Sequence, residues 1–278
     1  MAKNALKISE HCAEAYNLLA EESKDIEKKL EYYKEGVWAG ERFLIMREPS
    51  IPYGQYWHDV LLRSYLRSLE GYADTLVKMK NYKQAIGTYE HIIELNKNDN
   101  QGVRHKLVFL LIAEAMYDKA GKLLILFRDE ESLFMYWAQF LIGLLEKGMT
   151  SKTKKDFEKA IRYNPYLIKF LTGLEDAVYD LPTHYFPRSK NEVKVMMTFF
   201  DPCLDDNTVF IKVLLVSFTF IRDLARGHNV DDKKSQEDDR LMSATIENLE
   251  DLLRNPEKIA EYFQEKGGFS EKKKKIVK

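Results

Sequence analysis

Cysteine, proline and glycine are scarce in this chain of 278 residues, which contains 2, 7 and 13 of them. The two cysteines, Cys12 and Cys203, lie far apart and form no CxxC pair, so the sequence predicts neither a disulfide framework nor a zinc site. A reducing compartment fits this cysteine usage. All-β folds need many tight turns rich in proline and glycine, so the scarcity of both residues favours long helices.

A charge excess and a long apolar run are also missing. The chain has 43 basic and 44 acidic side chains, and a formal net charge of −1 does not predict binding to nucleic acid or to an acidic membrane. The longest apolar run, Val209 to Ile221, contains Lys212 and is too short to cross a bilayer. The first residues, MAKNALKISEHC, lack an apolar segment of signal-peptide length. We therefore expect a cytoplasmic protein without a membrane span.

Apolar residues recur at helical spacing along most of the chain. One series consists of Val60, Leu61, Tyr65, Leu69, Tyr72, Leu76 and Met79. Such spacing places the apolar side chains on one face of a helix, and packing against the rest of the protein then buries that face. Because no convincing run of alternating, strand-like residues accompanies it, the sequence predicts an all-α fold.

Three segments of the chain repeat with a period close to 34 residues. Tyr82 and Ala85 recur 35 residues later as Tyr117 and Ala120. Two further positions of the second segment recur 33 residues later, in the pairs Leu124 with Phe157 and Phe127 with Ala160. The clearest repeats then span 66–99, 101–134 and 134–167. A single helix pair cannot bury its own apolar face, so the sequence predicts that neighbouring pairs stack.

This period and residue pattern resemble the tetratricopeptide repeat. In the third copy the aromatic, turn, small and closing positions of the repeat are held by Trp137, Gly148, Ala160 and Pro165. The first copy departs from the pattern at Lys80 in the turn and Lys97 at the closing position. The resemblance implies a right-handed superhelical solenoid of antiparallel helix pairs, with a concave groove and a helical C-terminal cap. The alternative is a generic helical bundle whose spacing is accidental.

The stretch LNKNDNQGVRH, 95–105, is strongly polar between two apolar runs. It fits a calcium loop poorly, because counting from Asn96 places Gly102 one position late and leaves the twelfth residue without an acidic side chain. A turn between helices fits better. We expect Asp99 or Asn100 to cap the following helix, and Gly102 to allow close packing in its first turn.

The segment ELNKNDNQGVR, 94–104, also resembles the LNPNDNQGVR signature of a group of bacterial tetratricopeptide-repeat proteins related to the suppression-of-tumorigenicity family. Similar pieces follow the family's order over roughly residues 10–220, at 12–23, 32–44, 63–76, 160–173 and 185–195. Departures include Ser64 and Lys97, each in place of a proline. The resemblance implies a helical interaction scaffold and no defined catalytic activity.

Motifs for catalysis, nucleotide binding and metal binding do not stand out. The run GLLEKG, 143–148, lacks the Lys followed by Ser or Thr that completes a phosphate loop, and the six histidines form no HExxH pair. No GxSxG nucleophile elbow occurs either. We therefore expect a protein that is not an enzyme and that needs neither a cofactor nor a metal.

Three arginines are the main candidates for partner binding. Arg63 and Arg67 are four residues apart and share one helix face, and Arg104 lies in the first turn of the next repeat. First helices of neighbouring repeats line the groove, so the three arginines predict a basic patch for an acidic side chain or a peptide C-terminus. The alternative is a structural role in ion pairs, with Glu70, Asp74 or Asp99 as partners.

Two aromatic residues next to these arginines are further candidates. Tyr56 and Trp57 follow the helix-breaking run EPSIPYG, 48–54, which itself contains Tyr53. We expect them to pack one helix pair on the next, with a peptide-stacking shelf at the groove mouth as the alternative. Later in the chain, SKNE predicts a capping box in which Ser189 caps a helix and Glu192 reaches back to the Ser189 N–H.

The chain divides, on this interpretation, into a repeat domain, 1–227, a charged linker, 228–240, and a helical appendage with a basic tail, 241–278. The predicted function is a scaffold or adaptor that holds a protein or peptide segment in the concave groove. The alternative is a regulatory or host-directed effector module whose activity lies in the appendage.

Overall fold

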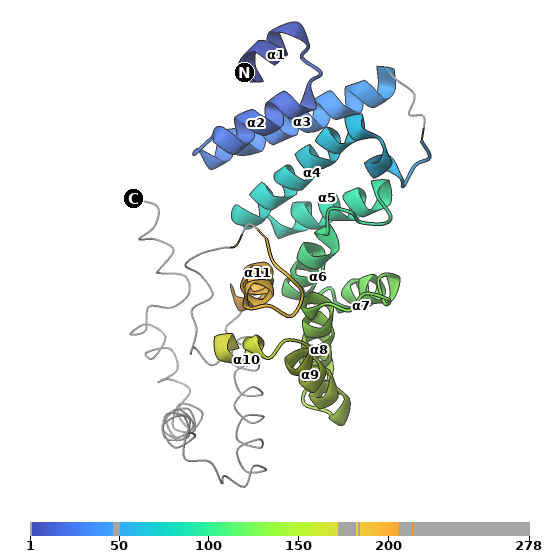
Figure 1. Ribbon diagram of the computed structural model, residues 1–278, viewed down its shortest axis with the longest axis vertical. Helices are drawn as coiled ribbons and strands as arrows, with labels where there is room; N and C mark the ends of the chain where they lie inside the picture. The colour runs from blue at the N-terminus through green and yellow to red at the C-terminus, as the bar shows by residue number, and fades with distance from the viewer. Residues whose placement is uncertain (1, 47–50, 172–181, 183, 206–212, 214–278) are drawn as a thin grey trace. The chain divides into compact units, whose positions relative to one another are not determined.

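The structure is a computed structural model that describes residues 2–46, 51–171, 182, 184–205 and 213. The described residues are helical apart from turns, with no β-strand among them, so the predicted all-α class is confirmed for this part of the chain (Figure 1). By its internal contacts the chain divides into two compact units, Met1–Val213 and Leu214–Lys278. The predicted linker, 228–240, and appendage, 241–278, lie outside the described residues.

The helices follow one another along the first unit (Figure 1). They are α1 (Ala2–Ile8), α2 (Ala13–Glu22), α3 (Ile26–Met46), α4 (Val60–Lys78), α5 (Tyr82–Leu95) and α6 (Val103–Ala113). The later helices are α7 (Tyr117–Leu126), α8 (Leu133–Lys147), α9 (Ser151–Tyr163), α10 (Tyr166–Leu171) and α11 (Lys190–Phe200). Two 3₁₀ helices are η1 (Tyr56–His58) and η2 (Asp201–Asp205). No described helix combines the length and hydrophobicity needed to cross a bilayer.

The turns from α4 to α5 and from α6 to α7 have the same backbone structure. Lys80 and Ala115 have φ angles of 60° and 54°, in the left-handed region that few residues other than glycine adopt. In the first turn the N–H of Asn81 donates to the Leu76 carbonyl at 2.9 Å. In the second turn the corresponding bond joins Met116 to Leu111 at 2.7 Å. Both helices therefore end in a Schellman motif, and the non-glycine residue takes the position usually held by glycine.

Helix α6 is buried on all its sides. Val103 and the run from Leu107 to Ile112 expose 2% of their surface or less. The helix packs against α5, α7 and α8, and α11 and η2 lie against it as well. Phe200 at the end of α11 makes an edge-to-face contact with Phe109, with ring centroids 6.0 Å apart. The centre of the apolar core therefore lies at α6, and the chain's own α11 covers part of that helix.

Two glycines bring α3 close to α4. A Cβ at Gly40 would lie 2.3 Å from the ring of Tyr65, and a Cβ at Gly71 would lie 2.2 Å from the ring of Tyr33. These distances are far shorter than van der Waals contact, so a side chain at either position would push the two helices apart. Glycine is needed at both positions because α3 and α4 lie so close together.

We predict that Gly40→Ala destabilises the protein by about 1–3 kcal/mol, because the added methyl group collides with a buried tyrosine ring. Gly87 in α5 is the matched control, since a Cβ there meets no atom within 4 Å. Gly87→Ala should instead stabilise by up to about 1 kcal/mol through helix propensity. Urea unfolding followed by circular dichroism measures both changes. Equal effects of the two substitutions would contradict the close approach of α3 and α4.

Candidate functional site

Asp99 organises the polar turn between α5 and α6. Its carboxylate accepts hydrogen bonds from the backbone N–H groups of Val103 and Arg104, each at 2.9 Å, and the residue exposes only 2% of its surface. The predicted N-cap position is wrong, because Gly102 holds it, but the Asp99 carboxylate supplies capping hydrogen bonds from three residues before Gly102. Gly102, expected to allow close packing, has a different role: a Cβ there would meet only His105 at 3.8 Å, and the φ of 73° explains the glycine.

Arg104 and His105 in the first turn of α6 bind one carboxylate. Arg104 donates to Glu130 through Nε and to Asp99 through a terminal nitrogen at 2.9 Å. The Nε2 atom of His105 lies 2.5 Å from the other Glu130 oxygen, and its ring stacks on Phe134 with centroids 4.4 Å apart. The ion pair between Arg104 and Asp99 is the one that the structural alternative predicted. The second partner, Glu130, was not predicted from the sequence.

Glu130 has an unusually acidic carboxyl group. Burial alone would raise its pKa, but hydrogen bonds and charge interactions with His105 and Arg104 outweigh burial and lower the pKa from 4.5 to about 2. A carboxyl whose pKa is lower in the folded protein stabilises the fold above its unfolded pKa. That contribution is lost as the pH falls from about 4.5 to about 2.

We predict that Glu130→Gln lowers the free energy of unfolding at pH 7 by roughly 3 kcal/mol at most, the equivalent of the lowered pKa. The difference from the unchanged protein should shrink as the pH falls below 4.5 and vanish near pH 2. Urea unfolding at several pH values measures it. Glu131→Gln, at an exposed neighbouring position, is the control and should change stability by less than about 0.5 kcal/mol. A pH-independent loss in Glu130→Gln would contradict the assignment.

Arg67 is also ion-paired, but with helix α2. Its guanidinium donates to Glu14 at 2.6 Å and to Glu21 at 2.8 Å. Arg63 donates through Nε to the Trp57 carbonyl at 2.9 Å and lies over the Trp57 ring, 5.1 Å from its centroid. The three predicted arginines therefore have separate partners, and none of these partners is shared.

Two of the three carboxylates proposed as structural partners of the arginines, Glu70 and Asp74, bind a lysine instead. Lys106 in α6 lies 2.8 Å from both Glu70 and Asp74, which are one turn apart on α4. The hydroxyl of Tyr89 donates to Asp74 as well. Burial lowers the pKa of Lys106, but the two carboxylates more than compensate and raise it. This network joins α4, α5 and α6, and its lysine stays charged.

The predicted aromatic residues lie beside η1. Tyr56 is buried, and its ring meets that of Tyr53 edge to face with centroids 5.8 Å apart. Trp57 is half-buried and carries the Arg63 guanidinium on its face. Tyr56 thus has the environment of a packing residue, while Trp57 retains partial exposure.

We predict that Arg67→Glu lowers the free energy of unfolding by about 1 kcal/mol, because it places a third carboxylate beside Glu14 and Glu21 on a partly exposed surface. The double variant Arg67→Glu, Glu14→Lys restores one attractive pair and should recover part of the loss. Thermal unfolding measures both. If Arg67→Glu leaves the melting temperature unchanged, the two ion pairs do not contribute to stability.

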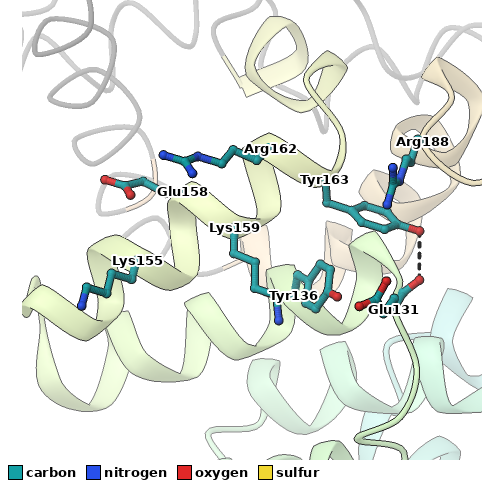
Figure 2. A pocket seen from close by; sticks show the side chains of 8 residues that line it. All are labelled: Glu131, Tyr136, Lys155, Glu158, Lys159, Arg162, Tyr163 and Arg188. Carbon is teal, nitrogen blue, oxygen red and sulfur yellow. Dashed lines mark hydrogen bonds between the residues drawn. The ribbon is translucent and has the colours of Figure 1, made fainter. Parts of the chain in front are cut away.

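A surface pocket of about 470 Å³ lies along α9 (Figure 2). The lining residues come from the loop before α8, from α8, from α9 and from the segment before α11. They are Glu131, Tyr136, Lys155, Glu158, Lys159, Arg162, Tyr163 and Arg188. Four of the eight are cationic and two are tyrosines, so the pocket combines positive charge with aromatic surface.

The two tyrosines form the inner wall of this pocket. Their rings meet edge to face with centroids 5.2 Å apart, and the Tyr163 hydroxyl donates to the Glu131 carbonyl at 2.9 Å (Figure 2). The Lys159 ammonium lies 4.1 Å from the centroid of Tyr136, and the Arg188 guanidinium lies 5.0 Å from that of Tyr163. Each ring therefore already binds one cation, which fixes where that positive charge lies.

The cations of the pocket form no ion pair with the carboxylates of the described residues. Within the described part of the chain, no carboxylate lies within ion-pair distance of Lys155, Lys159, Arg162 or Arg188. In this they differ from Arg67, Arg104 and Lys106. This cluster of cations is thus at a place that the sequence did not predict. The sequence pattern that could have revealed it is the spacing of Lys155, Lys159 and Arg162, which puts all three on one helix face.

A buried carboxylate holds Arg188 beside α9. Ser189 accepts a hydrogen bond from the Glu192 N–H at 3.2 Å, as the predicted capping box requires. The Glu192 carboxylate, however, accepts from the backbone N–H of Arg188 at 2.7 Å, one residue before the predicted donor. It also accepts from the side chain of Asn164 at 2.9 Å, just after α9. These bonds hold the Arg188 backbone at a φ of 62°.

No group of three or more potential metal ligands occurs among the described residues. Comparisons of the chain with protein-family models, characterised proteins and solved structures find no match. The tetratricopeptide-repeat resemblance therefore rests on residue patterns, and membership of that family stays a prediction.

Proposed function

We propose that this chain is a cytoplasmic, non-enzymatic scaffold that binds a protein or peptide segment on a solenoid of antiparallel helix pairs. The observation that carries the proposal is the order of packing. Each helix from α2 to α9 packs against the next one along the chain, and α2 also packs on α4 and α6 on α8. Stacked repeats typically show contacts between helices that are neighbours in the sequence. They also show contacts between the first helices of neighbouring repeats.

Equivalent positions in the three predicted repeats support the same proposal. Ala85 and Ala120 are completely buried in the second helices of the first two pairs. Ala160, assigned to the small position of the third copy, is also completely buried, although it comes 40 residues after Ala120. The left-handed residues of the first two turns, Lys80 and Ala115, are 35 residues apart. A recurring small buried residue after a recurring turn is what a repeated helix pair requires.

The state of the perturbed ionisable groups supports a binding role over catalysis. Glu130 and Lys106 are held in ion pairs in their charged forms. Burial raises the pKa of the Tyr89 hydroxyl and of the Cys203 thiol, so both stay protonated. A general base or a nucleophile needs the opposite arrangement, with a reactive form present near neutral pH.

Helix α11 limits where a partner can bind. It packs on α6 and α8, which are the first helices of two successive predicted repeats. In a solenoid these helices line the concave groove, so the chain's own α11 occupies that part of it. A partner segment therefore binds on the surface that α11 leaves uncovered, or else replaces α11.

A selection from a random peptide library on the full, folded chain tests the scaffold function. We expect a consensus sequence to be enriched over selections on a heat-unfolded sample of the same chain. Hydrogen exchange of the complex should then show protection within α4 to α9 or in the segment around Arg188. Failure of every folded sample to enrich any sequence above the unfolded control would overturn the proposal.

A further inference from the structure

We propose that the pocket along α9 binds an acidic peptide segment with carboxylates at alternate residues. The inference rests on the proposed scaffold function and gives it a ligand class and a site. It begins from the charge of the pocket, where four cations face two carboxylates. Because these cations have no acidic partner in the described part of the chain, a bound carboxylate need not displace one. A carboxylate that bound to Arg104 or Lys106 would have to displace an acidic partner.

The spacing of the cations favours an extended segment. Lys155, Lys159 and Arg162 lie along one face of α9, four and three residues apart. At a rise of 1.5 Å per residue these intervals are roughly 6 Å and 4.5 Å along the helix axis. In an extended peptide, side chains on one face are about 6.6 Å apart, two residues at about 3.3 Å each. Acidic residues at every second position therefore match the interval between Lys155 and Lys159, while the interval between Lys159 and Arg162 is roughly 2 Å shorter.

Arg188 supplies a fixed anchor at the end of this row. Its backbone is held by the buried Glu192, and its guanidinium lies on the Tyr163 ring, which Figure 2 shows at the end of α9. Tyr163 in turn is held by its bond to the Glu131 carbonyl. A guanidinium can bind a carboxylate through two parallel hydrogen bonds. Because both supporting contacts exist before binding, little ordering of this side chain opposes association.

The same pocket is poorly suited to a phosphate chain or to nucleic acid. Glu131 and Glu158 line it alongside the cations, and they would repel the dense negative charge of a polyphosphate. A peptide can avoid them, because neutral residues alternate with its acidic ones. The formal net charge of −1 also gives the chain no long-range attraction for a polyanion.

Fluorescence anisotropy with two labelled peptides tests the site. Asp-Thr-Asp-Thr-Asp has the predicted spacing, and Asp-Asp-Asp-Thr-Thr has the same composition without it. We expect tighter binding of the alternating peptide. Lys155→Glu combined with Lys159→Glu should weaken that binding by about 100-fold, roughly tenfold for each reversed charge. Lys83→Glu combined with Lys122→Glu, on α5 and α7, is the control of equal charge change and should leave the affinity within about twofold.

Three outcomes would overturn the inference. The first is equal affinity for the two peptides, and the second is an equal loss of affinity in the two double variants. The third is that inorganic phosphate or duplex DNA, at the same ionic strength, competes as strongly as unlabelled peptide does. Circular dichroism of each variant excludes unfolding as the cause of a loss. If library selection yields a non-acidic consensus that Lys155→Glu with Lys159→Glu does not affect, the pocket is wrong and the scaffold function stands. If selection yields nothing, the scaffold function fails too.

Discussion

Carboxylates set against the beginnings of helices hold the successive helix pairs in place. Asp99 accepts from the first two N–H groups of α6, and the buried Glu192 accepts from the N–H of Leu133, the first residue of α8, at 3.4 Å. The free N–H groups and the positive end of the helix dipole stabilise a negative charge there. Glu192 also binds the side chain of Asn164, just after α9, so this one side chain meets the beginning of α8 and the end of α9. The Asp99 carboxylate binds only α6, through two backbone N–H groups and the side chain of Arg104.

Two classes of cation follow from this arrangement. Arg104 and Lys106 lie among the carboxylates between helices, where removing either partner would leave an uncompensated charge. Lys155 and Arg162 lie on the outer face of α9 and are available to solvent and to ligands. The first class maintains the separation and register of the helices, and the second is available for recognition. The residue type does not distinguish the two classes, because Arg67 belongs to the first class and Arg162 to the second.

Local chemistry explains which features the sequence could predict. Helical spacing predicted the all-α class, and the Asx chemistry of residues 96–100 predicted capping hydrogen bonds that Asp99 provides, although the N-cap residue itself is Gly102. The partners of Arg67 and Arg104 were missed because Glu14, Glu21 and Glu130 are 26 to 53 residues away along the chain. No local pattern specifies such a contact. The pocket was missed for the same reason, since Arg188 meets Tyr163 of α9 across 25 residues of sequence, and the bonds of Glu192 to Arg188 and Asn164 place it there.

The position of Cys203 gives the α6 region a built-in reporter. Its thiol donates to the Phe109 carbonyl at 3.1 Å, and Cys203 exposes 1% of its surface where η2 packs on α6. A thiol reagent can reach this sulfur only when η2 separates from α6. The rate at which a thiol reagent modifies Cys203 therefore measures how often η2 detaches from α6. It records how often the native ensemble uncovers that face without any ligand present.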